Sequence, residues 1–134
     1  MKTLKEGDII YADSHADLLN QVFGTNYKAW MKSVWNYNDE TVVWMVRFNQ
    51  ERSGWYNSFV SNSRIREENI YRRRYWNNRH IRYVDKKRIA FEIDDSKAYR
   101  KYIFRGVYVY DEETSDPSSV RYHNKISSVF PEER

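Results

Sequence analysis

Cysteine is absent from this 134-residue sequence, so the fold uses neither disulfide bonds nor thiolate metal ligands. Glycine occurs 4 times and proline twice, and the sequence contains no phosphate-binding glycine loop and no serine nucleophile elbow. Residues 1–8 lack the apolar run of a secretion signal, and no later stretch approaches the roughly 20 apolar residues that span a membrane. We therefore expect a cytoplasmic protein with no membrane partner and no cofactor.

Aromatic residues are abundant, with 5 Trp, 12 Tyr and 6 Phe making up 17% of the chain. Tyr and Trp fit the half-buried surface of a strand, so this composition favours sheet over helix. The length and the 40% hydrophobic content suit one core rather than two. The sequence thus predicts a single domain over residues 1–134 of the α+β class, a small curled β-sheet or β-barrel of five to seven strands with two short N-terminal helices.

Both helices are expected directly after a first short strand at residues 7–11. Ser14 can cap a helix over residues 15–23, where apolar side chains have helical spacing and a glycine follows as a natural stop. Thr25 can cap a second helix over residues 26–34, because its aromatic and apolar residues also recur at i, i+3, i+4 and i+7.

The strands are predicted from β-branched runs and from alternation of apolar with polar residues. Residues 41–48 and 55–60 are typical of a hairpin, while the polar residues 61–70 indicate a loop or a single helical turn. Gly106 lies inside the longest predicted strand and indicates a bulge or a bend. The remaining predicted elements are an exposed hairpin or long loop at 71–84, strands at 88–93 and 101–110, a loop at 111–119 and a last strand from 120 to about 123.

Positive charge is concentrated in one part of the chain. Residues 64–105 contain 10 Arg and 4 Lys against 6 acidic residues, a net charge of +8, whereas the whole chain carries only +4. Such an asymmetry suits a phosphate backbone, and the aromatic and amide residues between the arginines can stack on bases or read their edges. The predicted nucleic-acid-binding residues are Arg64, Arg66, Arg72, Arg73, Arg74, Trp76, Asn77, Asn78, Arg79, His80, Arg82, Lys86 and Lys87. A solvated, charged hairpin without a ligand is the alternative interpretation of this region.

A second candidate site follows the turn glycine Gly54. Trp55, Tyr56 and Asn57 place an amide beside two aromatic side chains, an arrangement that can clamp a planar base. Packing of Trp55 and Tyr56 on opposite faces of a strand explains the same residues equally well. We treat Trp55, Tyr56 and Asn57 as a candidate base pocket.

Catalytic and metal-binding patterns are weak. The histidines His15, His80 and His123 do not have the mutual spacing of a metal site. Asp85 followed by residues 95–97 (DSK) only imitates the two acids and lysine that hold Mg²⁺ in many restriction enzymes, so no metal is expected. No catalytic acid–base pair is visible in the sequence either.

Two alternatives to nucleic-acid binding remain open. One is a small inhibitor or adaptor of the phage or mobile-element type that binds a nucleic-acid-processing enzyme, because Tyr, Trp and Arg also dominate protein interfaces. The other is a metal-independent RNase that uses His123, Tyr122 or His80 as acid or base.

The order of elements also carries a family resemblance. An opening at residues 7–10 (GDII), early helices, a central strand at 54–57 (GWYN) and a closing strand at 101–108 (KYIFRGVY) together resemble the PUA-like superfamily, which includes the SRA, EVE and ASCH domains. The resemblance implies a small curled β-barrel that binds RNA or DNA, in some branches with a modified or flipped base in an aromatic pocket. It further implies that residues 55–57 line such a pocket and that the arm at 72–82 lies on the nucleic-acid backbone.

Binding rather than catalysis is therefore the expected activity, with RNA or DNA as the first partner and a protein as the second. An exposed hairpin at 71–84 can pair with its copy in another chain, so both a monomer and a homodimer are compatible with the sequence.

Overall fold

The computed structural model describes residues 2–70, 86–116 and 119–132. This part of the chain contains one helix and eleven strands. Their bounds are β1 Leu4–Lys5, β2 Ile9–Tyr11, α1 His15–Phe23, β3 Val34–Asn36, β4 Thr41–Val46, β5 Glu51–Arg52, β6 Trp55–Ser61, β7 Arg64–Asn69, β8 Lys87–Asp94, β9 Lys101–Tyr110, β10 Val120–Ser127 and β11 Val129–Phe130.

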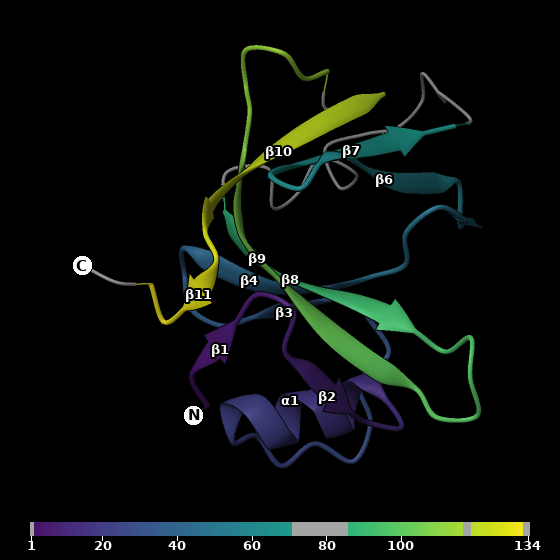
Figure 1. Ribbon diagram of the computed structural model, residues 1–134, viewed down its shortest axis with the longest axis vertical. Coiled ribbons are helices and arrows are strands. Elements are labelled where there is room, and N and C mark those ends of the chain that lie inside the picture. The colour runs from purple at the N-terminus through teal and green to yellow at the C-terminus, as the bar shows by residue number, and fades with distance from the viewer. Residues whose placement is uncertain (1, 71–85, 117–118, 133–134) are drawn as a thin grey trace.

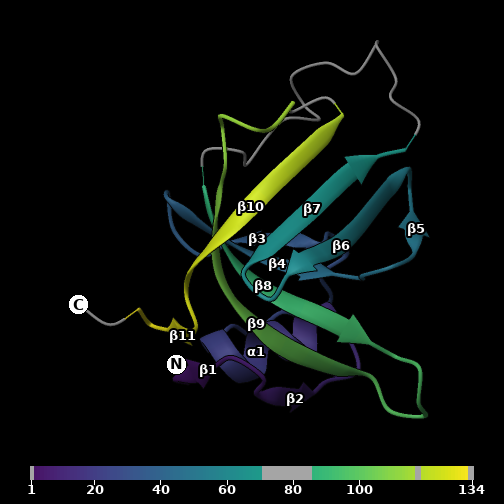
Figure 2. The same ribbon diagram turned by 45° about the horizontal axis from the view of Figure 1, so that its top comes forward.

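A single large sheet dominates the structure. Its strands follow the order β3-β4-β8-β9-β10-β7-β6-β5, β2 is added beside β9, and β1 and β11 form a separate pair. β4 and β8 run parallel, and the other neighbours are antiparallel. Figure 1 shows the sheet curling into a half-barrel, with β6, β7 and β10 opposite β4, β8 and β9 and with α1 on the outside. Figure 2 shows β10, β7 and β6 side by side along one wall.

Two hydrophobic cores lie on the two faces of this sheet. β4 is buried along its whole length because its alternate side chains enter different cores. Val43 and Met45 join the core under α1, whereas Trp44 and Val46 join a smaller core on the concave side. The concave side is therefore lined by large side chains from strands that are far apart in the sequence.

The first helix confirms the sequence prediction at both ends. The Ser14 hydroxyl accepts a hydrogen bond from the Asp17 backbone N–H at 3.1 Å, and Gly24 ends α1 in the left-handed conformation at φ 73°. The apolar side chains of α1 are buried against the convex face of the sheet, among them Leu18, Leu19 and Val22.

The predicted curled β-sheet is confirmed, but the second helix predicted at residues 26–34 is wrong, and so are the α+β description with two helices and the number of five to seven strands, since the described part of the chain has one helix and eleven strands. Residues 24–33 are irregular, and Val34 already belongs to β3. The Asn20 side chain bonds the backbone N–H and C=O of Tyr27, while the Tyr27 ring packs on Trp30 with centroids 5.1 Å apart. These contacts hold the segment against the end of α1 without helical hydrogen bonds, and Met31 of the supposed apolar face is 90% exposed.

Two strand predictions are also wrong. Residues 41–48 and 55–60 do not form a hairpin with each other, because β4 pairs with β3 and β8 while β6 pairs with β5 and β7. Residues 61–70 form a tight turn and the strand β7 rather than a loop. β7 alternates regularly between half-buried and buried residues, but two of its three buried residues are polar, so its hydrophobic pattern is weak.

The later strands agree with the sequence predictions at 88–93 and 101–110. The strand predicted from 120 to about 123 is β10, which extends to Ser127 and is followed by the short strand β11. Gly106 does mark a bulge, because Ala90 pairs with Gly106 but the next residue of β8 pairs with Phe104. The hairpin predicted at 71–84 lies outside the described residues. No helix in the described ranges is long and apolar enough to cross a membrane.

Candidate functional site

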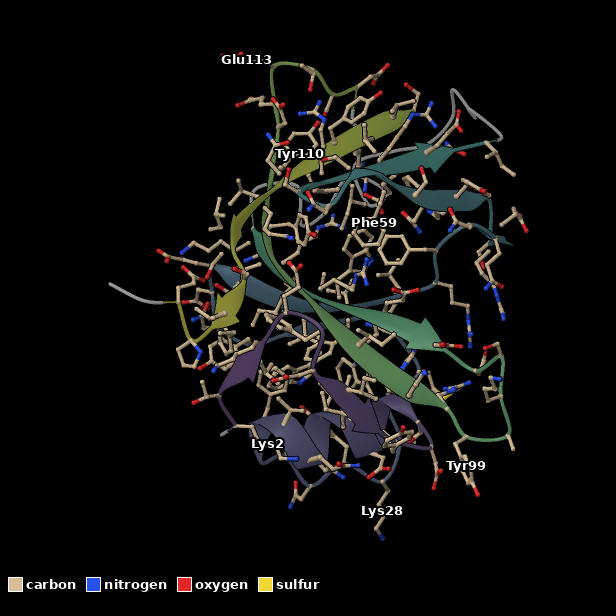
Figure 3. The ribbon with its side chains drawn as sticks, viewed as in Figure 1. Lys2, Lys28, Phe59, Tyr99, Tyr110 and Glu113 are labelled. Carbon is tan, nitrogen blue, oxygen red and sulfur yellow. The ribbon has the colours of Figure 1, made fainter. Side chains whose placement is uncertain are left out.

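An open cleft of about 550 Å³ lies on the concave side of the curled sheet. Its wall is formed by side chains from β4, β6, β7, β8 and β10, and the segments at residues 31–34 and 47–53 contribute to its edge. Near this space the Phe59 ring points between the two halves of the sheet (Figure 3), where it stacks on Phe48 with ring centroids 4.2 Å apart. The residues that matter most below are Trp44, Trp55, Asn57, Glu67, Arg88 and Arg121.

The strand register brings several of these residues into one row. Asn57 of β6 pairs with Glu67 of β7, and Glu67 pairs with Arg121 of β10. Directly paired residues project to the same side of a sheet, so all three side chains face the cleft. Trp55 lies two residues before Asn57 and therefore shares this face.

Glu67 is the centre of a buried polar cluster. Its Oε1 atom lies 3.0 Å from His123 Nε2, 3.5 Å from Arg88 Nη1 and 3.7 Å from Arg121 Nη1. Burial alone raises the pKa of Glu67, but the charge of Arg88, the hydrogen bond from His123 and the charge of Arg121 together bring it well below its usual range. Glu67 is therefore ionised and binds both arginines.

His123 supports this carboxylate as a neutral imidazole. Burial, followed by the charge of Arg88, lowers the pKa of His123 to about 4. Near neutral pH its Nε2–H donates to Glu67, and its Nδ1 atom is buried with no hydrogen-bond partner in the described part of the chain.

Both buried arginines also stack on tryptophan rings. The Arg88 guanidinium carbon lies 4.6 Å from the centroid of a Trp44 ring, and that of Arg121 lies 4.6 Å from a Trp55 ring. A guanidinium that stacks on an aromatic face keeps its N–H donors in the plane parallel to the ring. Glu67 and the two tryptophans thus fix the orientation of both guanidinium groups in the cleft wall.

Two further polar atoms of the cleft residues lack partners. Asn57 Oδ1 and Arg88 Nε are both buried, and neither makes a hydrogen bond to another described residue. A buried polar group without a partner costs about 1–3 kcal/mol. The residues that line the cleft therefore include a buried acceptor and a buried donor, together with the side chains of two tryptophans.

The candidate base pocket is brought together in part. Trp55 and Asn57 line the cleft, whereas Tyr56 lies between them and points to the opposite face of β6. Trp55 and Tyr56 therefore lie on opposite faces of the strand, which was the alternative interpretation of these residues, and Trp55 also lines the cleft.

The basic residues 64, 66, 86 and 87 lie away from this cleft and are engaged within the protein. Arg64 binds Asp111 at 3.0 Å and Arg66 binds Glu68 at 3.0 Å. Lys86 donates to a backbone carbonyl and Lys87 pairs with a glutamate, and both line a second depression of about 560 Å³ that also contains acidic residues. The predicted binding residues 72–82 lie outside the described residues.

Of the catalytic and metal-binding candidates, His123, Tyr122 and Asp95 make contacts within the protein, whereas His80 and Asp85 lie outside the described residues. His123 is fully buried, and Tyr122 carries the stacked Arg64 guanidinium 4.4 Å from its ring centroid. Asp95 forms ion pairs with Arg47 at 2.7 Å and Arg100 at 3.6 Å. Within the described ranges, no group of three His, Cys, Asp or Glu side chains has the geometry to hold a metal ion.

His15 lies at the edge of the cleft. Its Nδ1 atom is 2.7 Å from the Tyr102 hydroxyl, and burial, followed by the charges of Arg100 and Arg47, lowers its pKa to about 4. His15 is therefore neutral near neutral pH and adds no positive charge to the cleft.

Sequence reasoning missed Glu67, Arg88, Arg121 and Trp44. A signal was present, because each charged residue occupies an inward position of a strand, where a charge is rare unless it is paired. The partners of these charges are 21 or more residues apart in the sequence, so their pairing depends on which strands become neighbours and, for Arg88 and Glu67, on the curl of the sheet.

Comparisons with known proteins assign this chain to a family. A profile of the SET and RING associated (SRA) domain matches residues 1–131. The solved structure of "The 5-Hydroxymethylcytosine-Specific Restriction Enzyme AbaSI" matches with a TM-score of 0.69 at 18% sequence identity, over 95% of this chain and 41% of that chain. This chain therefore spans less than half the length of that enzyme, and the structural likeness concerns the fold. No curated protein matches the sequence.

Proposed function

This chain belongs to the SRA domain family, and from that premise we propose that it is a DNA-binding module that holds a modified cytosine, flipped out of the duplex, in the cleft on the concave side of its sheet. The observation that carries the proposal is that Asn57 and Arg88 line the cleft beside Trp44 and Trp55, and that Asn57 Oδ1 and Arg88 Nε are buried without a hydrogen-bond partner among the described residues.

The chemistry of these atoms suits a nucleobase. A flipped base is read by hydrogen bonds to its Watson–Crick edge and by stacking on aromatic side chains. Cytosine presents an amino donor next to ring acceptors on that edge, which complements the carbonyl oxygen of Asn57 and the N–H of Arg88. Trp55 supplies the flat surface, and a volume of about 550 Å³ leaves room for a base with a substituent.

Modified cytosine is favoured as the base because the enzyme that shares this fold is described as specific for 5-hydroxymethylcytosine. The proposal transfers only recognition, since this chain spans 41% of that enzyme. The cleavage reaction of the larger protein is no part of it.

The duplex would be held by the basic region of residues 64–105, whose net charge of +8 neutralises phosphates. The Tyr56 side chain lies on the face of β6 opposite the cleft, so in this proposal it belongs to the strand that carries the pocket but does not contact the base. The proposed contacts to the DNA backbone and to flanking bases are Arg64, Arg66, Arg72, Arg73, Arg74, Trp76, Asn77, Asn78, Arg79, His80, Arg82, Lys86 and Lys87.

The test compares duplexes that differ in one central cytosine, either unmodified, 5-methylated or 5-hydroxymethylated, by fluorescence anisotropy. The wild-type protein is expected to bind the modified duplexes more tightly. Asn57→Ala should weaken binding of the preferred duplex by about ten- to hundredfold, since a base-edge contact is worth about 1–3 kcal/mol. Asn62→Ala, in the exposed turn between β6 and β7, is the matched control and should leave binding unchanged. Equal affinity for all three duplexes would contradict the proposal.

A further inference from the structure

Arg52 differs from the other arginines that line the cleft because it is exposed and has no charged partner in the described part of the chain. The Arg47 guanidinium binds Asp95 at 2.7 Å, and Arg88 and Arg121 are buried in the wall, each 3% exposed. Arg52 lines the same cleft, but its side chain forms no ion pair or hydrogen bond with another described residue. A guanidinium has five N–H donors, so those of Arg52 are open to an anionic ligand.

The turn before Trp55 places Arg52 beside that ring. Ser53 and Gly54 have φ of 53° and 86°, the left-handed conformation that a two-residue hairpin turn requires at both positions. The turn pairs Arg52 of β5 directly with Trp55 of β6, and directly paired residues project to the same side with Cβ atoms about 4.5–5.5 Å apart. The adjacent acid, Glu51, alternates to the other side of the strand, and its carboxylate accepts the Gly54 backbone N–H at 2.9 Å.

Exposure increases along this wall from the interior of the cleft to its mouth. Asn57 is 8% exposed, Trp55 is half-buried and Arg52 is exposed, and β5 is the last strand at this edge of the sheet (Figure 2). A nucleotide that leaves a duplex enters a pocket with its base first, because its phosphates remain part of the strand. A base that stacks on Trp55 and bonds Asn57 therefore has its sugar and phosphates at the mouth, beside Arg52.

We propose, resting on the function proposed above, that Arg52 binds a phosphate next to the flipped nucleotide, so that the site recognises the modified base together with its own backbone. The guanidinium donates two parallel N–H bonds to the phosphate oxygens, a geometry that arginine provides and lysine does not. Ser53 lines the same edge of the cleft and adds a hydroxyl donor. Arg52 precedes the basic region of residues 64–105, so this contact is additional to those proposed above for the DNA backbone.

The experiment uses duplexes with one central 5-hydroxymethylcytosine in which a single phosphate is replaced by a neutral methylphosphonate. The replaced phosphate lies 5′ to the modified cytosine, 3′ to it, or, as a control, at the end of the duplex. For the wild-type protein, fluorescence anisotropy should show about three- to fivefold weaker binding for one of the two flanking replacements, as expected for the loss of one exposed charge pair, and no change for the end. Arg52→Gln should weaken binding of the unreplaced duplex by the same factor, and the flanking replacement should then have no further effect.

Lys28→Gln is the matched control. Lys28 is exposed and does not line the cleft, and its side chain extends away from the sheet, below α1 (Figure 3). Its substitution removes one positive charge without altering the mouth of the cleft, so the flanking replacement should weaken binding as it does for the wild type. The inference is overturned if the flanking replacement weakens Arg52→Gln as much as the wild type, or if Arg52→Gln binds the unreplaced duplex as tightly as the wild type does.

Salt dependence provides a second measurement. Arg52→Gln should reduce the slope of log affinity against log salt by about 0.9, because one phosphate contact is lost. Arg52→Lys keeps the positive charge and should have the slope of the wild type, but its affinity should be lower because lysine lacks the planar fork of donors. An unchanged slope for Arg52→Gln would exclude Arg52 from contact with phosphate.

The same titrations separate this inference from the proposed function. A wild-type protein that prefers the hydroxymethyl duplex to the cytosine duplex, but shows no coupling between Arg52 and a flanking phosphate, contradicts the inference and leaves the proposed function intact. A wild-type protein that binds both duplexes equally contradicts the proposed function and the inference with it, because any contact of Arg52 with phosphate would then belong to DNA without a flipped base.

Discussion

Replacing Glu67 with glutamine removes the carboxylate that pairs with both buried arginines of the cleft. The substitution keeps the shape of the side chain and an oxygen that accepts the hydrogen bond of His123, now 3.0 Å away. It removes the charge that compensates Arg88 and Arg121, which lie 3.5 and 3.7 Å from Oε1. Breaking one partner of a buried ion pair costs about 3–5 kcal/mol, and the retained hydrogen bond favours the lower end of that range.

A loss of about 3 kcal/mol is large for a domain whose free energy of unfolding is about 5–15 kcal/mol. It corresponds to a decrease of roughly 10 °C in Tm for a domain of this size. Urea unfolding followed by tryptophan fluorescence and thermal unfolding followed by circular dichroism measure the two quantities independently.

The adjacent residue provides the control. Glu68 pairs with Arg66 at 3.0 Å near the surface, where the two side chains are 18% and 30% exposed. Glu68→Gln should cost only about 0–1 kcal/mol, the usual range for a partly exposed pair. The reasoning would be refuted if Glu67→Gln destabilised the protein no more than Glu68→Gln.

Three further predictions concern acid stability, the bulge and DNA binding. The pKa of His123 falls from 6.5 to about 4 on folding, so the unfolded chain binds the proton more tightly than the folded one. The free energy of unfolding therefore decreases as pH falls from about 6.5 to 4. His123→Gln should make the free energy of unfolding less dependent on pH in that window. Gly106→Ala should destabilise the fold by about 1–3 kcal/mol in urea unfolding, because φ is +109° and the added Cβ would lie 2.9 Å from the Ser127 carbonyl oxygen. Alanine at residues 72–74 should weaken binding to all duplexes alike and reduce the slope of log affinity against log salt by about 2–3, whereas an unchanged slope would exclude this arm from phosphate contacts.

Local signals in the sequence predicted the elements that depend on local chemistry. The Ser14 cap and Gly24 stop defined α1, and the β-branched or alternating runs located β4, β8 and β9. Gly106 indicated the bulge because only glycine readily adopts its φ of +109°. The resemblance to the PUA-like superfamily, based on the order of elements and three short segments, is confirmed by the SRA domain match.

Elements that depend on distant contacts were predicted poorly. The helical spacing of Tyr27, Trp30 and Met31 was misleading because an aromatic pair and the Asn20 side chain stabilise an irregular segment there. β7 was missed because its inward positions Glu67 and Asn69 are polar. These residues are polar because β7 lines a polar cleft. A strand in that position lacks the alternation of apolar with polar residues by which strands are predicted from a sequence.

The candidate site was predicted in the same uneven way. Trp55 and Asn57 were identified from their proximity to a turn, and both line the cleft. Arg88 was not, because its pairing with Glu67 requires β8 to face β7 across the curled sheet. Arg121 was not, because its pairing with Glu67 depends on β10 lying beside β7, which is distant in the sequence. A buried charge in a strand is therefore the signal to examine first in a chain of this kind.

The most direct measurement of the central claim is the fluorescence of 2-aminopurine placed next to the modified cytosine in a duplex saturated with the wild-type protein. Withdrawal of the cytosine into the cleft unstacks its neighbour, so emission should rise well above that of the free duplex and should rise much less with Asn57→Ala. Emission that stays at the level of the free duplex while anisotropy shows full binding would contradict a flipped base in the cleft.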